Sequence, residues 1–147
     1  MTDVEGRAPL AREEDVVVLG RRDAAEAEEH GSQRIEDTAI EIIDLGGLRS
    51  LGAAAAAARA LERLSRSELG GFWIHLDADV LDDTILPAVD YRMPDGLSWD
   101  ELEATLRIAM ATDRATGLDL TIFNPRLDPD HSIARRLAKT LAAGLRS

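Results

Sequence analysis

The stretch GGFWIHLDADVLD, residues 70–82, decides the fold class and holds the most informative polar side chains of the sequence. Two glycines precede an apolar run over residues 72–77, which is typical of a strand in a parallel β-sheet. The run ends at Asp77, and Asp79 follows two residues later. Functional groups of open α/β sheets gather at the carboxyl ends of strands. We therefore predict a functional site at this strand end.

Three more apolar runs predict further strands, and helix-forming segments separate them. The expected strands cover residues 15–20, 39–45, 72–77 and 117–123, and the expected helices cover residues 21–31, 48–66, 98–110 and a segment from 132 onward. Strands that alternate with helices are typical of βαβ units. The expected fold class is therefore α/β, a three-layer αβα arrangement with a mainly parallel sheet.

The domain organisation expected from this pattern is simple. Residues 1–14 are polar and irregular and are predicted to form an N-terminal arm, while residues 15–147 form a single α/β domain. The Ser98-x-x-Glu101 pattern predicts a capping box at the start of a helix. We expect Trp73 to pack in the core, and the pair at residues 21–22, both arginines, to lie on a solvated face.

Composition excludes several classes of function. The formal net charge of −11 argues against nucleic acid and anionic membrane surfaces as partners. The absence of cysteine excludes disulfides, thiol catalysis and cysteine-ligated zinc. No stretch approaches the roughly 18 consecutive apolar residues of a membrane span, and the acidic N-terminus is unlike a secretory signal. We therefore expect a cytoplasmic protein that acts without a membrane.

The spacing of Asp77 and Asp79, two residues apart in an extended chain, predicts a cation site. Two carboxylates that point to the same side repel each other unless a positive charge lies between them, and oxygen ligands suit Mg²⁺, Mn²⁺ or Ca²⁺. His75 lies two residues before Asp77 and so points to the same side, where it either binds the cation or supports a residue that does. A purely structural interpretation also stands, in which these aspartates cap loops and turns.

The surroundings of this pair resemble the ureohydrolase family, which includes arginase, agmatinase and formiminoglutamase. The family signature is Asp-x-Asp-x-x-Asp-Pro, then a proline, then Gly-Gly-Leu before a helix. This sequence has DADVLDD at residues 77–83, Pro87 and DGLS at residues 95–98 without a gap in spacing. Residues 117–125, GLDLTIFNP, are similar to a second family motif, a Gly-Leu-Asp strand that ends in Glu-x-Asn-Pro. The resemblance covers roughly residues 15–145 and implies part of the arginase fold.

The resemblance implies a chemistry and a set of site residues. In the family two Mn²⁺ ions bridge a water or hydroxide that attacks the carbon of a guanidinium, amidine or related group. Asp77 and Asp79 match metal ligands of the family, while Asp119 and His75 are assigned supporting roles. The implied activity is a metal-dependent hydrolase of linear C–N bonds in guanidino, amidino or related small molecules. Asp82 is expected to hold the loop.

Departures from the family pattern limit what this chain does alone. The other metal ligands of the family lie in a Gly-Gly-Asp-His motif and an Asp-x-His-x-Asp motif, and neither is present. The chain resembles the carboxyl-terminal half of the family, so we expect it to be inactive unless a complementary N-terminal half or a second copy in a homo-oligomer completes the site. The alternative is a catalytically inactive remnant that serves as an interaction or oligomerisation module.

Two further departures concern the substrate. Ile122 occupies the position of the family glutamate that pairs with a cationic guanidinium, and an aliphatic side chain makes no such pair. The Gly-Thr-Pro that commonly follows the signature is replaced by residues 90–92, Asp-Tyr-Arg. We hypothesise a neutral or anionic small-molecule substrate with Arg92 as its binding partner.

Overall fold

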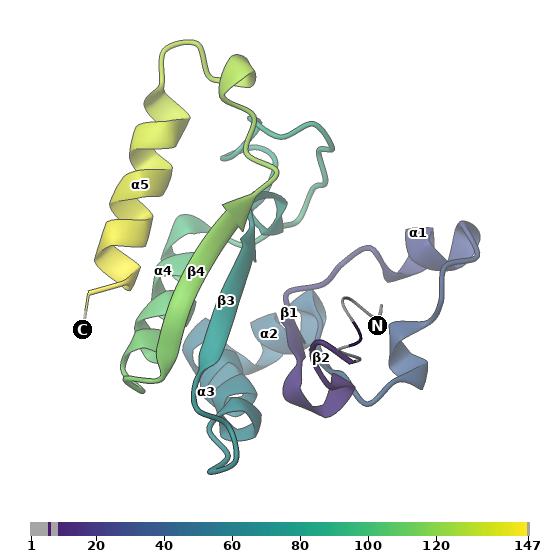
Figure 1. Ribbon diagram of the computed structural model, residues 1–147. Coiled ribbons are helices and arrows are strands. Elements are labelled where there is room, and N and C mark those ends of the chain that lie inside the picture. The colour runs from purple at the N-terminus through teal and green to yellow at the C-terminus, as the bar shows by residue number, and fades with distance from the viewer. Residues whose placement is uncertain (1–5, 7–8, 147) are drawn as a thin grey trace.

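The computed structural model describes residue 6 and residues 9–146 and shows strands alternating with helices along the chain (Figure 1). The strands are β1 (Val17–Leu19), β2 (Glu41–Ile43), β3 (Phe72–Asp77) and β4 (Ala115–Thr121). The helices are α1 (Ala24–Glu29), α2 (Leu45–Leu51), α3 (Ala53–Leu64), α4 (Trp99–Met110) and α5 (Ser132–Gly144). All strand pairs between these elements are parallel, which confirms the α/β class.

The predicted N-terminal arm falls partly outside the described residues. Its described end contains a short 3-10 turn, Glu13–Asp15, directly before β1. None of the helices in the described part of the chain combines the length and apolar character that a membrane span needs.

Within the described residues the strands form two sheets of two strands each. β1 pairs with β2, and β3 pairs with β4 in a register that sets His75 beside Asp119 and Asp77 beside Thr121. One hydrophobic core nevertheless includes side chains from both sheets, such as Ile43 and Leu76. The two sheets therefore belong to one packed unit.

Helices cover one face of β3 and β4, as Figure 1 shows for α3 and α4. Buried alanines on α3, among them Ala56 and Ala60, let this helix pack closely. The expected single helix over residues 48–66 is wrong in one respect, because the chain breaks at Gly52 (φ 84°) into α2 and α3. A positive φ favours glycine, which has no Cβ to clash.

The capping box at the start of α4 is confirmed. The backbone N–H of Glu101 donates to the Ser98 hydroxyl at 3.2 Å, and the backbone N–H of Ser98 donates to the Glu101 carboxylate at 2.8 Å. The cap fixes where the long loop after β3 ends, and so limits the path of that loop past the strand end.

The expectation that Trp73 lies in the core is wrong. Trp73 is 61% exposed, whereas Phe72 and Leu76 on the same strand are buried. Alternation along β3 sends Trp73 to the outer face of the sheet, and the indole lies over Gly117 of the neighbouring strand. Any side chain at Gly117 would occupy the space of that ring, since a Cβ there would come within 2.1 Å of it.

The loop after β3 returns to run beside its own beginning. The Leu97 N–H donates to the Val80 carbonyl at 2.8 Å, and the Asp82 N–H donates to the Leu97 carbonyl at 3.0 Å. Gly96 makes this approach possible, because a Cβ at that position would lie 2.2 Å from the carbonyl carbon of Leu81. The returning part of the loop, through Leu97, thereby fixes the segment that carries Asp77, Asp79 and Asp82.

We predict that Gly96→Ala lowers the free energy of unfolding by about 3 kcal/mol, because the new methyl group meets backbone atoms that have no room to move. Chemical denaturation measured by circular dichroism checks this value. Gly70→Ala is the control, since a Cβ at Gly70 meets no atom within 4 Å. Equal stability of the two variants would contradict the close approach.

Candidate functional site

The carboxyl end of β3 carries the predicted acidic pair. Asp77 is the last residue of the strand, and a single 3-10 turn, Ala78–Val80, follows it. The Asp77 carboxylate accepts a long hydrogen bond, 3.4 Å, from the backbone N–H of Asp79. The turn therefore holds the two acidic residues next to each other, and Asp77 serves as its cap, as the structural interpretation expected.

The two carboxylates interact unfavourably when both are charged. Burial raises the pKa of the Asp79 carboxyl, and the negative charge of Asp77 raises it further, while the nearby Arg22 opposes the shift. Such a pair gains stability from a cation that both carboxylates can share. The chemistry of the donors thus fits part of a site for a hard divalent ion.

A second polar cluster lies on the outer face of β3 and β4. Asp119 accepts a hydrogen bond from the Trp73 indole Nε1 at 2.5 Å and contacts the His75 Nδ1 at 2.7 Å. The hydrogen bond from Trp73, and then that from His75, lowers the pKa of Asp119. Because an ionised carboxylate only accepts, Nδ1 of His75 is the donor in this contact.

The end of β4 is tied to the loop that follows β3. The Asn124 N–H donates to the Ala88 carbonyl at 2.8 Å, and the Asn124 side chain donates to the Asp90 carboxylate at 2.5 Å. Ile122, which lies between the last residue of β4 and Asn124, is 46% exposed and has a positive φ of 69°. The position that the family gives to glutamate is therefore strained, accessible and uncharged in this chain.

Two other predicted residues also lie in the loop after β3. Asp82 accepts a hydrogen bond from the Thr84 N–H at 3.0 Å, so it holds a turn as expected. Arg92 donates to the Asp83 carbonyl at 3.0 Å and forms an ion pair with the Asp83 carboxylate at 3.2 Å. The Arg92 side chain remains 52% exposed.

Two residues that contribute to this region were not predicted from the sequence. Arg22, expected on a solvated face, is half-buried and donates hydrogen bonds to backbone carbonyls of the loop after β3. Trp73 supplies a donor to Asp119 rather than core volume. The signals were available, since Arg22 lies two residues after Gly20, where a predicted strand ends, and Trp73 lies two residues before His75 and so on the same face of its strand.

The described residues do not complete a metal site. No group of three or more His, Cys, Asp or Glu side chains among them is arranged to hold a metal ion. Asp77 and Asp79 are therefore two candidate ligands and not a complete set among these residues.

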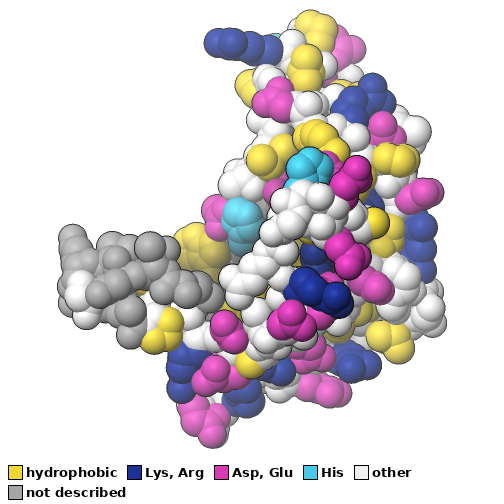
Figure 2. Space-filling model, turned by 90° about the vertical axis from the view of Figure 1, so that its right-hand side faces the viewer, with side chains coloured by type: hydrophobic (Ala, Val, Ile, Leu, Met, Phe, Trp, Pro, Cys, Tyr) yellow, Lys and Arg dark blue, Asp and Glu magenta, His cyan; other side chains and the backbone are white. Residues whose placement is uncertain are grey.

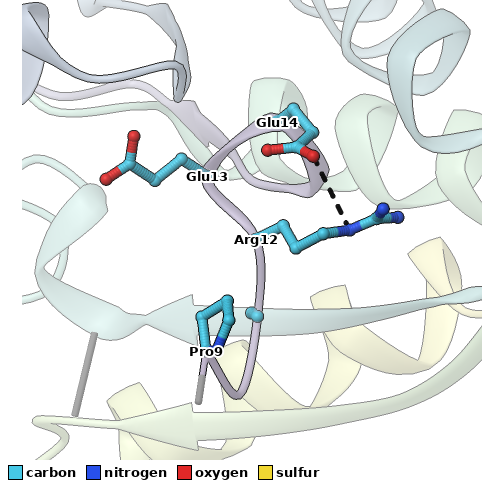
Figure 3. A pocket seen from close by; sticks show the side chains of 5 residues that line it. Pro9, Arg12, Glu13 and Glu14 are labelled. Atoms are coloured by element: carbon cyan, nitrogen blue, oxygen red, sulfur yellow. Dashed lines mark ion pairs between the residues drawn. The ribbon is translucent and has the colours of Figure 1, made fainter.

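Other surfaces of the molecule offer less. A hollow near β1 is lined by Pro9 and residues 11–14 and contains an ion pair between Arg12 and Glu14 at 3.7 Å (Figure 3). No strand end contributes to its lining. The face drawn in Figure 2 shows acidic side chains interspersed with arginines and small hydrophobic areas.

Comparison with known proteins finds one family. The sequence profile of the Arginase family matches residues 6–146. An arginase of Agrobacterium fabrum is 30% identical over 144 residues, which are 96% of this chain and 43% of that protein. An arginase of Brucella melitensis is 32% identical over 114 residues, which are 78% of this chain and 36% of that protein. This chain thus spans less than half the length of these curated relatives.

Solved structures agree on the fold. An arginase of Bacillus subtilis superposes with a TM-score of 0.84 at 24% identity, covering 97% of this chain and 49% of the other. A formimidoylglutamase of Bacillus subtilis superposes with a TM-score of 0.77 at 21% identity, covering 91% of this chain and 41% of the other. The fold is therefore shared with both kinds of protein.

We predict that Asp79→Asn stabilises the chain at neutral pH, since folding raises the pKa of Asp79 and its ionised form is unfavourable in the folded state. We expect the melting temperature to rise by roughly 1–2 °C at pH 7.5. The gain should vanish as the pH falls through the raised pKa toward about 3.9, the unfolded value, because Asp79 then becomes neutral.

Thermal melts at several pH values check this prediction. The control is Asp100→Asn in the first turn of α4, where removing an acid weakens a favourable interaction with the helix dipole and gives no gain. A lower melting temperature for Asp79→Asn at pH 7.5 would show that the pair is not strained by charge.

Proposed function

Because this chain belongs to the arginase family, we propose that it contributes Asp77 and Asp79 to the manganese site of a hydrolase. The reaction is the cleavage of linear C–N bonds in guanidino, amidino or related small molecules. The observation that carries the proposal is the pair of carboxylates at the end of β3, where burial and mutual repulsion raise the pKa of Asp79. A cation between them relieves that repulsion.

The metal, when bound, lowers the pKa of a coordinated water and stabilises the charge that develops during hydrolysis. This chain supplies two carboxylates, and other ligands come from a complementary segment or a second copy. The proposal therefore includes an assembled, active form and an inactive isolated chain. We place this protein in the cytoplasm, where small guanidino and amidino compounds reach it.

Asp119 and His75 act in support of the metal pair. Asp119 holds the Nδ1 edge of the His75 ring, and the His75 side chain is 62% exposed. His75 and Asp77 are two residues apart in β3 and therefore lie on the same face of the strand. An oriented imidazole then lies beside the strand end that carries the ligands.

The substrate is neutral or anionic overall. Ile122 offers no carboxylate to pair with a cationic guanidinium, and it is exposed at the end of β4. Arg92 offers a cation in the neighbouring loop, and Asp83 holds it through a hydrogen bond and an ion pair.

A second candidate function is that of an interaction or oligomerisation module without catalysis. The observation that favours it is the outer face of the β3–β4 sheet, where Trp73 is 61% exposed. Apolar groups on a sheet face of this kind are commonly covered by another chain. The incomplete ligand set among the described residues agrees with this alternative.

We predict that Mn²⁺ binds this chain through the acidic pair and that Asp77→Ala/Asp79→Ala weakens the binding by about tenfold or more. Isothermal titration calorimetry measures the affinity directly. The control is Glu28→Ala/Glu29→Ala, which removes the same charge from exposed positions on α1.

The outcomes separate the two candidate functions. Binding that is lost in the aspartate variant and kept in the glutamate variant supports the metal site. Absent binding, or weak binding that is indifferent to both variants, contradicts it and favours the interaction module.

We predict that Arg92→Ala in an assembled, active enzyme raises KM about tenfold with kcat nearly unchanged, because a charge-assisted hydrogen bond to the substrate is lost. Steady-state kinetics with a neutral or anionic substrate measures both constants. Arg107→Ala, an exposed residue on α4, is the control. An unchanged KM would refute the role of Arg92.

A further inference from the structure

An arginine that follows β1, Arg22, donates hydrogen bonds to the acidic turn after β3. Arg22 lies three residues beyond the end of β1. Its Nη2 donates to the Asp79 carbonyl at 2.5 Å and to the Met93 carbonyl at 2.9 Å, and its Nε donates to the Pro94 carbonyl at 3.1 Å. A longer contact of 3.5 Å reaches the Leu81 carbonyl.

These acceptors lie on two different arms of one loop. Asp79 and Leu81 belong to the outgoing arm that begins at the strand end, whereas Met93 and Pro94 belong to the arm that returns toward α4. One planar guanidinium therefore connects both arms. Arginine suits this task because its five N–H groups are fixed in a fork, whereas lysine offers a single flexible ammonium.

The anchor of Arg22 is itself well placed. The backbone of β1 continues through Gly20, where a Cβ would lie 3.1 Å from the Val80 side chain, so the end of β1 touches the acidic turn. The neighbouring Arg21 has a different role, since it donates to Asp23 and Glu36, which are exposed acids. Only the second arginine of the pair reaches the loop.

The bond to the Asp79 carbonyl matters most for the site. It fixes the peptide group that follows Asp79, and this restricts the direction in which the Asp79 side chain leaves the backbone. The positive charge of Arg22 also acts on the Asp79 carboxylate and opposes the effect of Asp77 there. Arg49 adds hydrogen bonds to the Asp95 and Gly96 carbonyls at 3.1 and 3.2 Å, further along the returning arm.

We propose that Arg22 is a positioning residue for the metal site, which holds the turn 77–82 in the conformation that presents Asp77 and Asp79 together. This inference rests on the proposed function, because the turn has to carry metal ligands for positioning to matter. It adds a residue outside the signature motif to the machinery of the site. Arg22 acts through the backbone of the loop and touches neither metal nor substrate.

The test compares Arg22→Gln and Arg22→Lys with the matched control Arg21→Gln in the full chain. Two quantities are measured: the Mn²⁺ affinity, from water-proton relaxation, and the amide hydrogen exchange of Asp82 and Leu97, whose N–H groups hold the two arms together. We expect both Arg22 variants to bind Mn²⁺ about tenfold more weakly and to exchange these two amides about tenfold faster. We expect Arg21→Gln to change neither quantity.

Amides that are hydrogen-bonded between β3 and β4 report global stability in the same experiment. Their exchange should stay within about twofold of the wild type, and equal acceleration there would overturn positioning in favour of a general loss of stability. Unchanged exchange of Asp82 and Leu97 in Arg22→Gln would also overturn it. If the wild type fails to bind Mn²⁺, the proposed function fails, and positioning of a metal site by Arg22 fails with it.

Discussion

The structure depends on keeping two carboxylates at the end of one strand. β3 is apolar where it faces the helices and ends in Asp77. The 3-10 turn that follows keeps Asp79 next to Asp77. Burial and like charge make this arrangement unfavourable in the absence of a cation. The surrounding loop, the capping box of α4 and two arginines hold that arrangement against the repulsion.

Packing near this pair follows from the same constraint. The loop after β3 has to leave the strand end and return beside it, which requires a residue without a side chain at Gly96. The cap at Ser98 then directs the chain into α4, whose Leu102 and Leu106 are buried in the core shared by both sheets. Stability and site geometry therefore have a common origin in residues 77–98.

Much of this arrangement could be predicted from the sequence where local chemistry determines it. The strand at residues 72–77 and the capping box at Ser98 are set by short patterns of apolar and polar residues, and both are confirmed. The spacing of acidic residues with DGL and with GLDLTIFNP identified the family without a structure. The break of the long helix at Gly52 was missed, because the residues before Gly52 and the alanines after it both form helix. A single glycine between two helix-forming segments does not by itself predict a break.

Other features depend on contacts between distant segments. Trp73 was expected in the core because the strand is apolar at most positions, yet its outer face is not covered in the described part of the chain. The contact of Arg22 with carbonyls 57 and 71 residues away in the sequence requires the tertiary fold. The pairing of Trp73 and His75 on Asp119 required the register of β3 against β4, which no single strand reveals.

The most direct test of the account is to map where Mn²⁺ binds on the isotopically labelled chain by paramagnetic broadening of its amide NMR signals. We expect selective broadening at residues 77–79, extending to Asp119, at manganese concentrations that leave the other acidic surfaces unaffected. Broadening that is uniform, or that is centred on exposed acids such as those of α1, would contradict the claim that this strand end is a metal-binding element.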